Sequence, residues 1–388
     1  MDTESSGASS SDTSTLVAGG APSKASDTGR VSPKDLLPAF LKLSRADIHS
    51  KFIDLEWQQR NRLAQGGIYT PENASQWARL ANDETARRNR YMNVDPFVQN
   101  RVPLRVPEGH SDYINASFIQ LTSTISGTKK EFIATQGPKE GSHSHLWRMI
   151  WHECADPVVI VMLTQTHESG REKCFQYFPF DLEDPELRIN EEDEFGDGFI
   201  ATLTLKNITD DKATSSTIRE MELTTADGQT KKIWHMLFGG WPDYSIPEGE
   251  DINGLVRLVD FSASKNPIIT GTNSSAPRVV HCSAGVGRTG TFIALDWLLA
   301  EFREGRFDNI EQDKDPIADV VDELRGQRMM MVQGEQQFFF LYDVMRQLWL
   351  DRKTDNEERL KLDSASLSSE ERLRAAFEQE MKDNAERM

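Results

Sequence analysis

The stretch Val279–Phe292, VVHCSAGVGRTGTF, constrains the fold of this chain more than any other. Its first residues are apolar and mostly β-branched, which predicts a short buried strand over Arg278–His281. Two glycines, Gly285 and Gly287, then mark a turn. The apolar pattern of Thr291–Phe302 predicts an amphipathic helix after it. A strand, a tight turn and a helix in this order indicate a sheet with helices packed against it, and so an α/β or α+β domain.

The turn itself has the composition of an anion-binding loop. Its glycines allow backbone conformations in which successive N–H groups point inward. The helix that follows directs its positive end at the same place. Arg288 adds a planar fork that matches two phosphate oxygens. We therefore expect one tetrahedral oxyanion to be held by Arg288 and by the backbone of Ser283, Ala284, Gly285, Val286 and Gly287.

Cys282 stands at the entrance of this loop. The positive field should favour its thiolate form, which is the nucleophilic one. The Thr289 hydroxyl can bond the sulfur and ease its departure in a second step, and we expect His281 to tune Cys282 through hydrogen bonds. A buried, inert cysteine is the alternative, but the Cys-x5-Arg-Thr spacing with two glycines argues against it. A Walker loop fits poorly, because the Lys-Ser/Thr pair is missing.

Charge and cysteine content limit the class of protein. The 44 Lys and Arg against 62 Asp and Glu leave a net charge of -18, which argues against nucleic acid as the main partner. No apolar run reaches the ~18 residues of a membrane span. The 3 cysteines cannot form a disulfide framework, and no spacing of His, Cys and Asp is typical of a metal site. We expect an intracellular protein with reduced thiols and with neither metal nor cofactor.

Apolar segments recur from about Leu36 to about Leu350 without a long polar gap, which predicts one domain over residues 37–350. The patterns predict strands over Pro157–Leu163, Phe199–Leu205 and Lys232–Phe238, and helices over Pro38–Leu63, His145–Glu153 and Phe338–Leu350. Residues 1–36, rich in serine, are expected to form a disordered leader, and residues 351–388 a charged tail that is partly helical. Asp181–Gly198 carries nine acids and one base and is expected to be a solvated loop.

The string VHCSAGVGRTG resembles the signature loop of the tyrosine-specific protein tyrosine phosphatases of the non-receptor type. Dual-specificity phosphatases share the Cys-x5-Arg core but usually not the whole string. The resemblance covers roughly residues 40–350, and its motifs come in the family's order. It implies a single domain with a twisted mixed β-sheet flanked by helices. It also implies hydrolysis of phosphotyrosine through a cysteinyl-phosphate, without a metal.

Two further motifs resemble loops that surround the family's catalytic cysteine. Asn89–Val94 resembles the substrate-recognition loop, in which Tyr91 stacks on the phosphotyrosine ring and Asn93 bonds the peptide backbone. A phosphoserine side chain would be too short to reach the sulfur at the bottom of such a slot. Glu168–Cys174 resembles the loop in which Glu168 pairs with Arg288 and Lys173 contacts the acid-bearing loop.

The remaining catalytic groups are implied by two more motifs of the family. Trp241-Pro242-Asp243 resembles the acid loop, and Asp243 would protonate the leaving phenolate as general acid. In a stretch that resembles the glutamine loop, Gln333 would position the attacking water and Gln337 would line the pocket. Arg325 and Arg328 lie in the same stretch and are expected to be structural or to line a secondary pocket.

The resemblance also implies partners, namely tyrosine-phosphorylated proteins, and suggests activated MAP kinases among them. A negative regulator of kinase signalling, in the cytoplasm and also in the nucleus, would fit this layout. Two alternatives stay open. One is a phosphotyrosine-binding module without turnover, although Asp243, Cys282 and Arg288 are all present. The other is a signalling scaffold in which the two tails do the main work.

Overall fold

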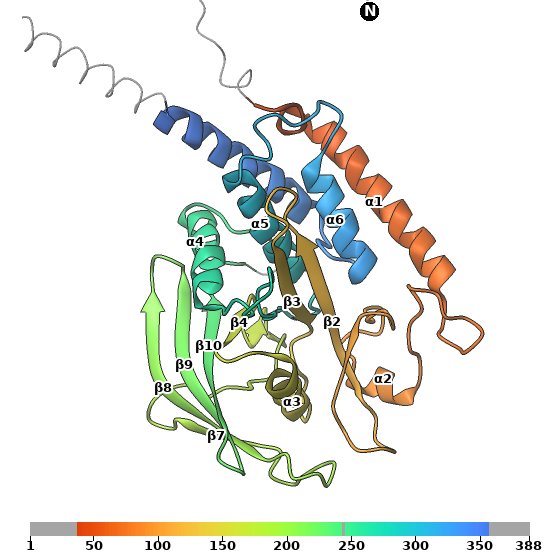
Figure 1. Ribbon diagram of the computed structural model, residues 1–388, viewed down its shortest axis with the longest axis vertical. Helices are drawn as coiled ribbons and strands as arrows, with labels where there is room; N and C mark the ends of the chain where they lie inside the picture. The colour runs from red at the N-terminus through yellow and green to blue at the C-terminus, as the bar shows by residue number, and fades with distance from the viewer. Residues whose placement is uncertain (1–36, 243–244, 357–388) are drawn as a thin grey trace, which may run out of the picture. The chain divides into compact units, whose positions relative to one another are not determined.

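A nine-stranded mixed sheet runs through the computed structural model, which describes residues 37–242 and 245–356 (Figure 1). In order across the sheet, the strands are β1 Arg101–Pro103, β2 Tyr113–Thr122, β3 Lys129–Thr135, β11 Arg278–His281, β4 Val158–Met162, β10 Thr230–Phe238, β9 Ser216–Thr225, β8 Ala201–Asp211 and β7 Glu186–Ile189. A separate two-stranded sheet joins β5 His167–Glu168 to β6 Arg171–Glu172. The mixed sheet confirms the predicted fold class.

The centre of the large sheet is parallel and buried. β11 pairs in parallel with β3 and β4, and β4 pairs in parallel with β10. Every residue of β4 and β11 is buried, as expected for short apolar strands covered on both faces. Ligands of such sheets bind at the carboxyl ends of the parallel strands. Here β11 ends at His281, directly before Cys282, and β10 ends at Phe238, directly before the Trp241 segment.

Helices cover both faces of the sheet (Figure 1). They are the short 3-10 helix η2 Ala39–Lys42, the α-helices α1 Arg45–Gly66, α2 Asp83–Arg88, α3 His143–Glu153, α4 Glu250–Lys265, α5 Gly287–Arg303 and α6 Pro316–Gln327, and a helix over residues 335–356. The core on one face is built from η2, α1, α4, α5, α6 and residues 338–349, and the core on the other face from α3. Of these α-helices, none in the described ranges is long and apolar enough to cross a membrane.

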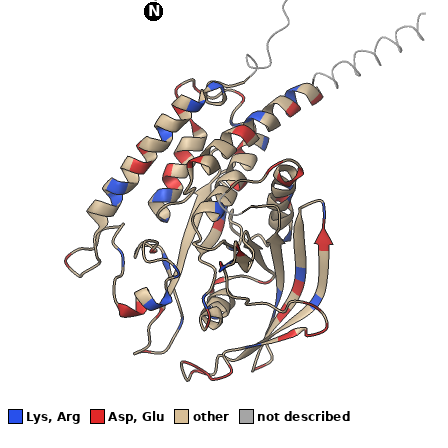
Figure 2. Cartoon of the chain, turned by 180° about the vertical axis from the view of Figure 1, so that it is seen from behind, with Lys and Arg blue, Asp and Glu red and all other residues tan. Residues whose placement is uncertain are grey.

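Most secondary-structure predictions agree with these bounds, and two are wrong. The Thr291–Phe302 helix is not amphipathic, because α5 is buried on nearly every side between the sheet and the other helices. The acidic segment Asp181–Gly198 is not simply a solvated loop. It contains β7, the edge strand, which pairs with β8. Charged residues otherwise follow the outer helices and the antiparallel strands, and of the central strands β4 and β11 only β11 carries one, Arg278 (Figure 2).

The acidic segment also makes specific contacts with α3. Glu194 lies 2.8 Å from Nε2 of His145, and Asp197 accepts two hydrogen bonds of 2.6 and 2.7 Å from Arg148.

The predicted leader, residues 1–36, and the tail beyond residue 356 lie outside the described residues. The helix of residues 335–356 does continue past the predicted boundary at Leu350.

Candidate active site

The loop between β11 and α5 closes tightly against the β3 strand. Gly285 has φ +71°, and a Cβ at this position would lie 2.2 Å from the carbonyl oxygen of Thr135. Only glycine fits such a conformation and such a close approach. The loop turns the backbone of Ser283–Gly287 into α5, which begins at Gly287. The predicted strand, turn and helix are therefore present in the predicted order.

Cys282 lies at a pocket of about 350 Å³ and is 5% exposed. The Thr289 hydroxyl donates to its sulfur at 3.3 Å, as expected from the sequence. Nδ1 of His281 lies 3.2 Å from the Cys282 carbonyl oxygen. The described lining of the pocket comprises Tyr91, Asn93, Val94, Glu168, Lys173, Cys282, Ser283, Ala284, Gly287, Arg288, Gln333 and Gln337. These residues come from four segments that the sequence motifs had singled out.

The other two cysteines differ from Cys282 in their surroundings. Cys154 and Cys174 are both buried and free. Burial raises the pKa of the Cys154 thiol to about 12. Burial also raises the pKa of the Cys174 thiol well above its ordinary value. Both groups stay protonated at neutral pH, which fits structural roles.

Arg288 is oriented by Glu168, the partner that the resemblance implied. Nη1 donates to Oε1 at 2.6 Å and Nη2 donates to Oε2 at 2.9 Å. Nη1 also donates to the Leu163 carbonyl at 3.0 Å, at the end of the β4 segment. Two parallel bonds of this kind fix the plane of a guanidinium as well as its position. The fork of Arg288 is thus set before any anion enters the pocket.

Arg328, which was expected to be structural or to line a secondary pocket, holds the signature loop from behind. Its buried guanidinium donates to the carbonyl oxygens of Gly285 at 2.8 Å and Ala284 at 3.2 Å, and to Oδ1 of Asn115 at 2.7 Å. Burial lowers the pKa of Arg328 to about 10, so it remains a cation at neutral pH. Because these loop carbonyls face Arg328, they are turned away from the anion that the N–H groups would bind.

A buried chain of side chains ends at the Cys282 backbone, and the sequence motifs did not reveal it. The Tyr177 hydroxyl lies 2.6 Å from Nε2 of His281 and 3.0 Å from Nε2 of His235. Burial lowers the pKa of His281 to about 4 and that of His235 well below its usual range, so both rings are neutral at pH 7. If Nδ1 of His281 donates to the Cys282 carbonyl, its Nε2 must accept from Tyr177. His235 then donates from Nε2 to the Tyr177 oxygen.

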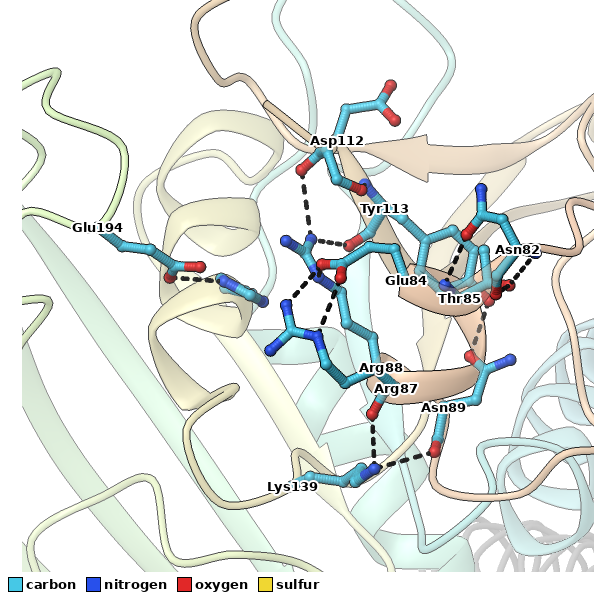
Figure 3. A network of polar contacts seen from close by, with 12 residues as sticks. Asn82, Glu84, Thr85, Arg87, Arg88, Asn89, Asp112, Tyr113, Lys139 and Glu194 are labelled. Carbon is cyan, nitrogen blue, oxygen red and sulfur yellow. Dashed lines mark hydrogen bonds and ion pairs between the residues drawn. The ribbon is translucent and has the colours of Figure 1, made fainter. Parts of the chain in front are cut away.

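The recognition segment after α2 is fixed by a polar network (Figure 3). Oδ1 of Asn89 accepts from the Tyr113 hydroxyl at 2.7 Å and from Asn115 at 2.8 Å. Lys139 donates to the backbone carbonyls of Arg87 at 2.6 Å and Asn89 at 3.3 Å, at the end of α2. These contacts anchor the backbone just before Tyr91.

Tyr91 itself reaches the signature loop. Its hydroxyl lies 2.8 Å from Oγ of Ser283, and Ser283 in turn donates to the Lys173 carbonyl at 2.9 Å. The ring lines the pocket and is partly exposed, as a wall for an aromatic substrate requires. Asn93 lines the same pocket.

The acid-loop segment begins beside Arg288. Trp241 is buried, and its Nε1 donates to the Ser245 carbonyl at 3.0 Å across the turn. The Pro242 carbonyl lies 3.4 Å from Nη2 of Arg288. Asp243, the predicted general acid, lies outside the described residues. The prediction for it therefore rests on its place next to Pro242.

Comparisons with known proteins agree with this geometry. The model of the protein-tyrosine phosphatase family matches residues 85–347, a range that includes every predicted site residue. The chain is 34% identical over 339 residues to tyrosine-protein phosphatase 1 of Saccharomyces cerevisiae, covering 80% of this chain and 97% of that protein. It is 39% identical over 308 residues to tyrosine-protein phosphatase 2 of Schizosaccharomyces pombe, covering 78% of this chain but only 39% of that longer protein.

A solved structure gives the same result for the fold. The catalytic domain of human protein tyrosine phosphatase non-receptor type 18 matches with a TM-score of 0.61 and 28% sequence identity. The match covers 78% of this chain and 96% of that chain. Family model, sequence relatives and fold agree, and the chain belongs to the protein-tyrosine phosphatase family of enzymes.

Proposed function

We propose that this chain hydrolyses phosphotyrosine in proteins through a cysteinyl-phosphate intermediate. The observation that carries the proposal is the position of Cys282 in a pocket whose Arg288 fork is fixed by Glu168. The Cys282 thiolate attacks phosphorus, and the sulfur–phosphorus bond forms as the bond to the tyrosine oxygen breaks. Arg288 and the loop N–H groups hold the three other oxygens, and Asp243 gives its proton to the leaving phenolate.

In the second step, water releases phosphate from the cysteine. Gln333 orients the water, and the Asp243 carboxylate takes its proton as the oxygen–phosphorus bond forms. The sulfur leaves as a thiolate, which the hydrogen bond from Thr289 stabilises. Positive charge for both steps comes from Arg288 and from the start of α5.

We infer tyrosine selectivity from the depth of the pocket. Tyr91 stands at its wall and Cys282 is almost fully buried, so a long aryl phosphate is needed to bring phosphorus to the sulfur. Gln337 completes the lining, while Asn93 bonds the peptide backbone. Lys173 and Trp241 support the acid loop in this scheme.

The proposal is tested by phosphate release from two peptides of one sequence, carrying either phosphotyrosine or phosphoserine. The wild-type chain should release phosphate from the first alone. Cys282→Ser should release none while it still binds the phosphotyrosine peptide, and Cys154→Ala serves as a matched control that keeps activity. Turnover by Cys282→Ser would overturn the assignment of the nucleophile. Peptide binding without turnover by the wild type would favour the alternative of a binding module.

For the physiological substrates we propose tyrosine-phosphorylated proteins, with activated MAP kinases among them. The chain would then act as a negative regulator of kinase signalling in the cytoplasm and the nucleus, with residues 37–350 as its catalytic part. Structures of protein tyrosine phosphatase non-receptor type 18 with phosphopeptides support the peptide class. Capture of phosphoproteins from a cell extract by an Asp243→Ala variant would identify the substrates. Full activity of residues 37–350 on them would exclude the scaffold alternative.

A further inference from the structure

A second pocket, of about 570 Å³, has no described lining residue in common with the catalytic pocket. We call it the Arg219 pocket. It lies where the ends of β8, β9 and β10 meet the segment after β6, and its volume is in the range of small-molecule sites. Its apolar wall consists of Phe178, Phe180, Ile208 and Leu237. A flat apolar group such as an aromatic ring could pack against these side chains.

Arg219, on β9, is a buried cation in this wall, and most of its hydrogen-bond donors have no acceptor among the described residues. The residue is 4% exposed, and no described residue accepts a hydrogen bond from its Nε or Nη1. Nη2 donates only to the Phe180 carbonyl at 3.4 Å, and the guanidinium lies over the Phe178 ring. A buried cation in such surroundings is costly unless an acceptor balances it. The pocket therefore supplies no acceptor for Nε and Nη1 of Arg219.

The acids of the pocket already have partners elsewhere. Oδ1 of Asp210 accepts from Thr217 at 2.8 Å, Oδ2 of Asp211 accepts from Thr214 at 2.7 Å, and Asp181 accepts from the backbone of its own turn. None of these three carboxylates accepts a hydrogen bond from Arg219, although the charge of Asp210 acts on its guanidinium. Lys212 also lines the pocket, so the three acids leave the lining with a small net negative charge. A ligand with several negative charges would be repelled, whereas a single charge aimed at Arg219 would be favoured.

We propose that the Arg219 pocket binds an aromatic monocarboxylate, its ring against the Phe178 and Leu237 wall and its carboxylate on Arg219. The walls of this site continue into two catalytic loops. The Thr166 carbonyl, in the wall, accepts from Lys173 N at 2.8 Å in the loop that carries Glu168. Gly239, also in the wall, donates to the Ser215 carbonyl at 2.9 Å just before Trp241. A bound ligand should thus alter kcat without competing with substrate.

The test measures binding of 2-naphthoate to the full chain by calorimetry, with 2-naphthamide as the uncharged probe. Arg219→Met removes the charge at similar length, and Ile208→Trp fills the pocket but keeps Arg219. Arg188→Met, at an exposed arginine of β7 in the same sheet, is the matched control. Arg288→Met removes the anion fork of the catalytic pocket, where an aryl carboxylate could also bind.

The wild type, Arg188→Met and Arg288→Met should bind 2-naphthoate alike. Arg219→Met should bind it at least ~10-fold more weakly, the usual scale for a lost hydrogen bond to a charge, and Ile208→Trp should also lose binding. The amide should bind the wild type at least ~10-fold more weakly than the acid. Loss of binding in Arg288→Met alone, equal binding by Arg219→Met, or no binding to the wild type would each overturn the proposal. The result does not depend on phosphatase activity.

Discussion

Glu168 fixes Arg288 through two hydrogen bonds, of 2.6 Å to Nη1 and 2.9 Å to Nη2, and both side chains are largely buried. Replacement of Glu168 by Gln keeps the shape but removes one acceptor and the negative charge. The fork then loses its fixed plane, and we expect kcat/KM on a phosphotyrosine peptide to fall by ~10–100-fold, as for other groups that orient a functional side chain.

The chain offers a matched control for this variant. Asp260 makes a similar two-bond contact with Arg303, of 2.6 and 2.7 Å, at the exposed C-terminal end of α5. Asp260→Asn should leave kcat/KM unchanged, because an exposed pair contributes little and lies away from the pocket. Equal losses in the two variants would mean that Glu168 acts only through the stability of α5 and not through Arg288.

Asp243 should be required for turnover but not for binding. In Asp243→Ala, phenyl phosphates with poor leaving groups lose the proton donor, so kcat should fall by ~10²–10⁴-fold. KM should not rise, because Arg288 and the loop still hold the phosphate. The measurement is kcat for a series of aryl phosphates of increasing leaving-group pKa. A steep decline with leaving-group pKa in the variant and a shallow one in the wild type is expected. The same shallow dependence in both would point to another acid.

Tyr177→Phe should destabilise the fold around the catalytic strand. The change leaves Nε2 of His281 and Nε2 of His235 without their shared partner in the core. Unpaired buried polar groups cost about 1–3 kcal/mol each, so the loss of a partner by two of them should lower the free energy of unfolding by about 2–6 kcal/mol. Urea unfolding measures it, with Tyr69→Phe, at an exposed tyrosine, as the control. A decrease in unfolding free energy no larger than that of the control would contradict the hydrogen bonds from Tyr177 to His281 and His235.

The hydrogen bonds of Tyr177 also show what could not be predicted from the sequence. The signature loop is contiguous, so its residue types alone indicate an anion site at the end of a buried strand. The contacts of Tyr177 and Arg328 instead join residues 104, 58 and 43 positions apart. Only the folded sheet brings such residues together, and no local pattern marks them.

The two wrong secondary-structure predictions also have physical causes. Strand β7 was missed because an edge strand tolerates the charges that the Asp181–Gly198 composition displays, and composition alone suggested a loop. Thr291–Phe302 was predicted to be amphipathic partly because of the polar residue Asp296. In the structure Asp296 is buried and accepts hydrogen bonds from Arg278 at 2.6 Å and from Lys130 at 2.7 Å. A periodic pattern does not distinguish such a buried ion pair from a solvent-facing side chain.

His281 should make the stability of the protein depend on pH in a defined window. Burial lowers its pKa in the folded state to about 4, from an ordinary value of 6.5. Above pH 6.5 the ring is neutral in both states, and its contribution is fully present. As the pH falls from 6.5 toward 4, His281 becomes protonated in the unfolded state but stays neutral in the folded state, so the free energy of unfolding decreases.

Replacement of His281 by Gln should remove this contribution. One proton corresponds to about 1.4 kcal/mol per pH unit, so the slope of unfolding free energy between pH 6 and pH 5 should become shallower by up to that amount. The comparison uses slopes from urea unfolding at each pH, because the variant also loses hydrogen bonds and is less stable at every pH. His110→Gln, at an exposed histidine, should keep the wild-type slope. An unchanged slope in His281→Gln would show that His281 is protonated in the folded protein over this range, and the tautomer assigned to the Tyr177 contact would be wrong.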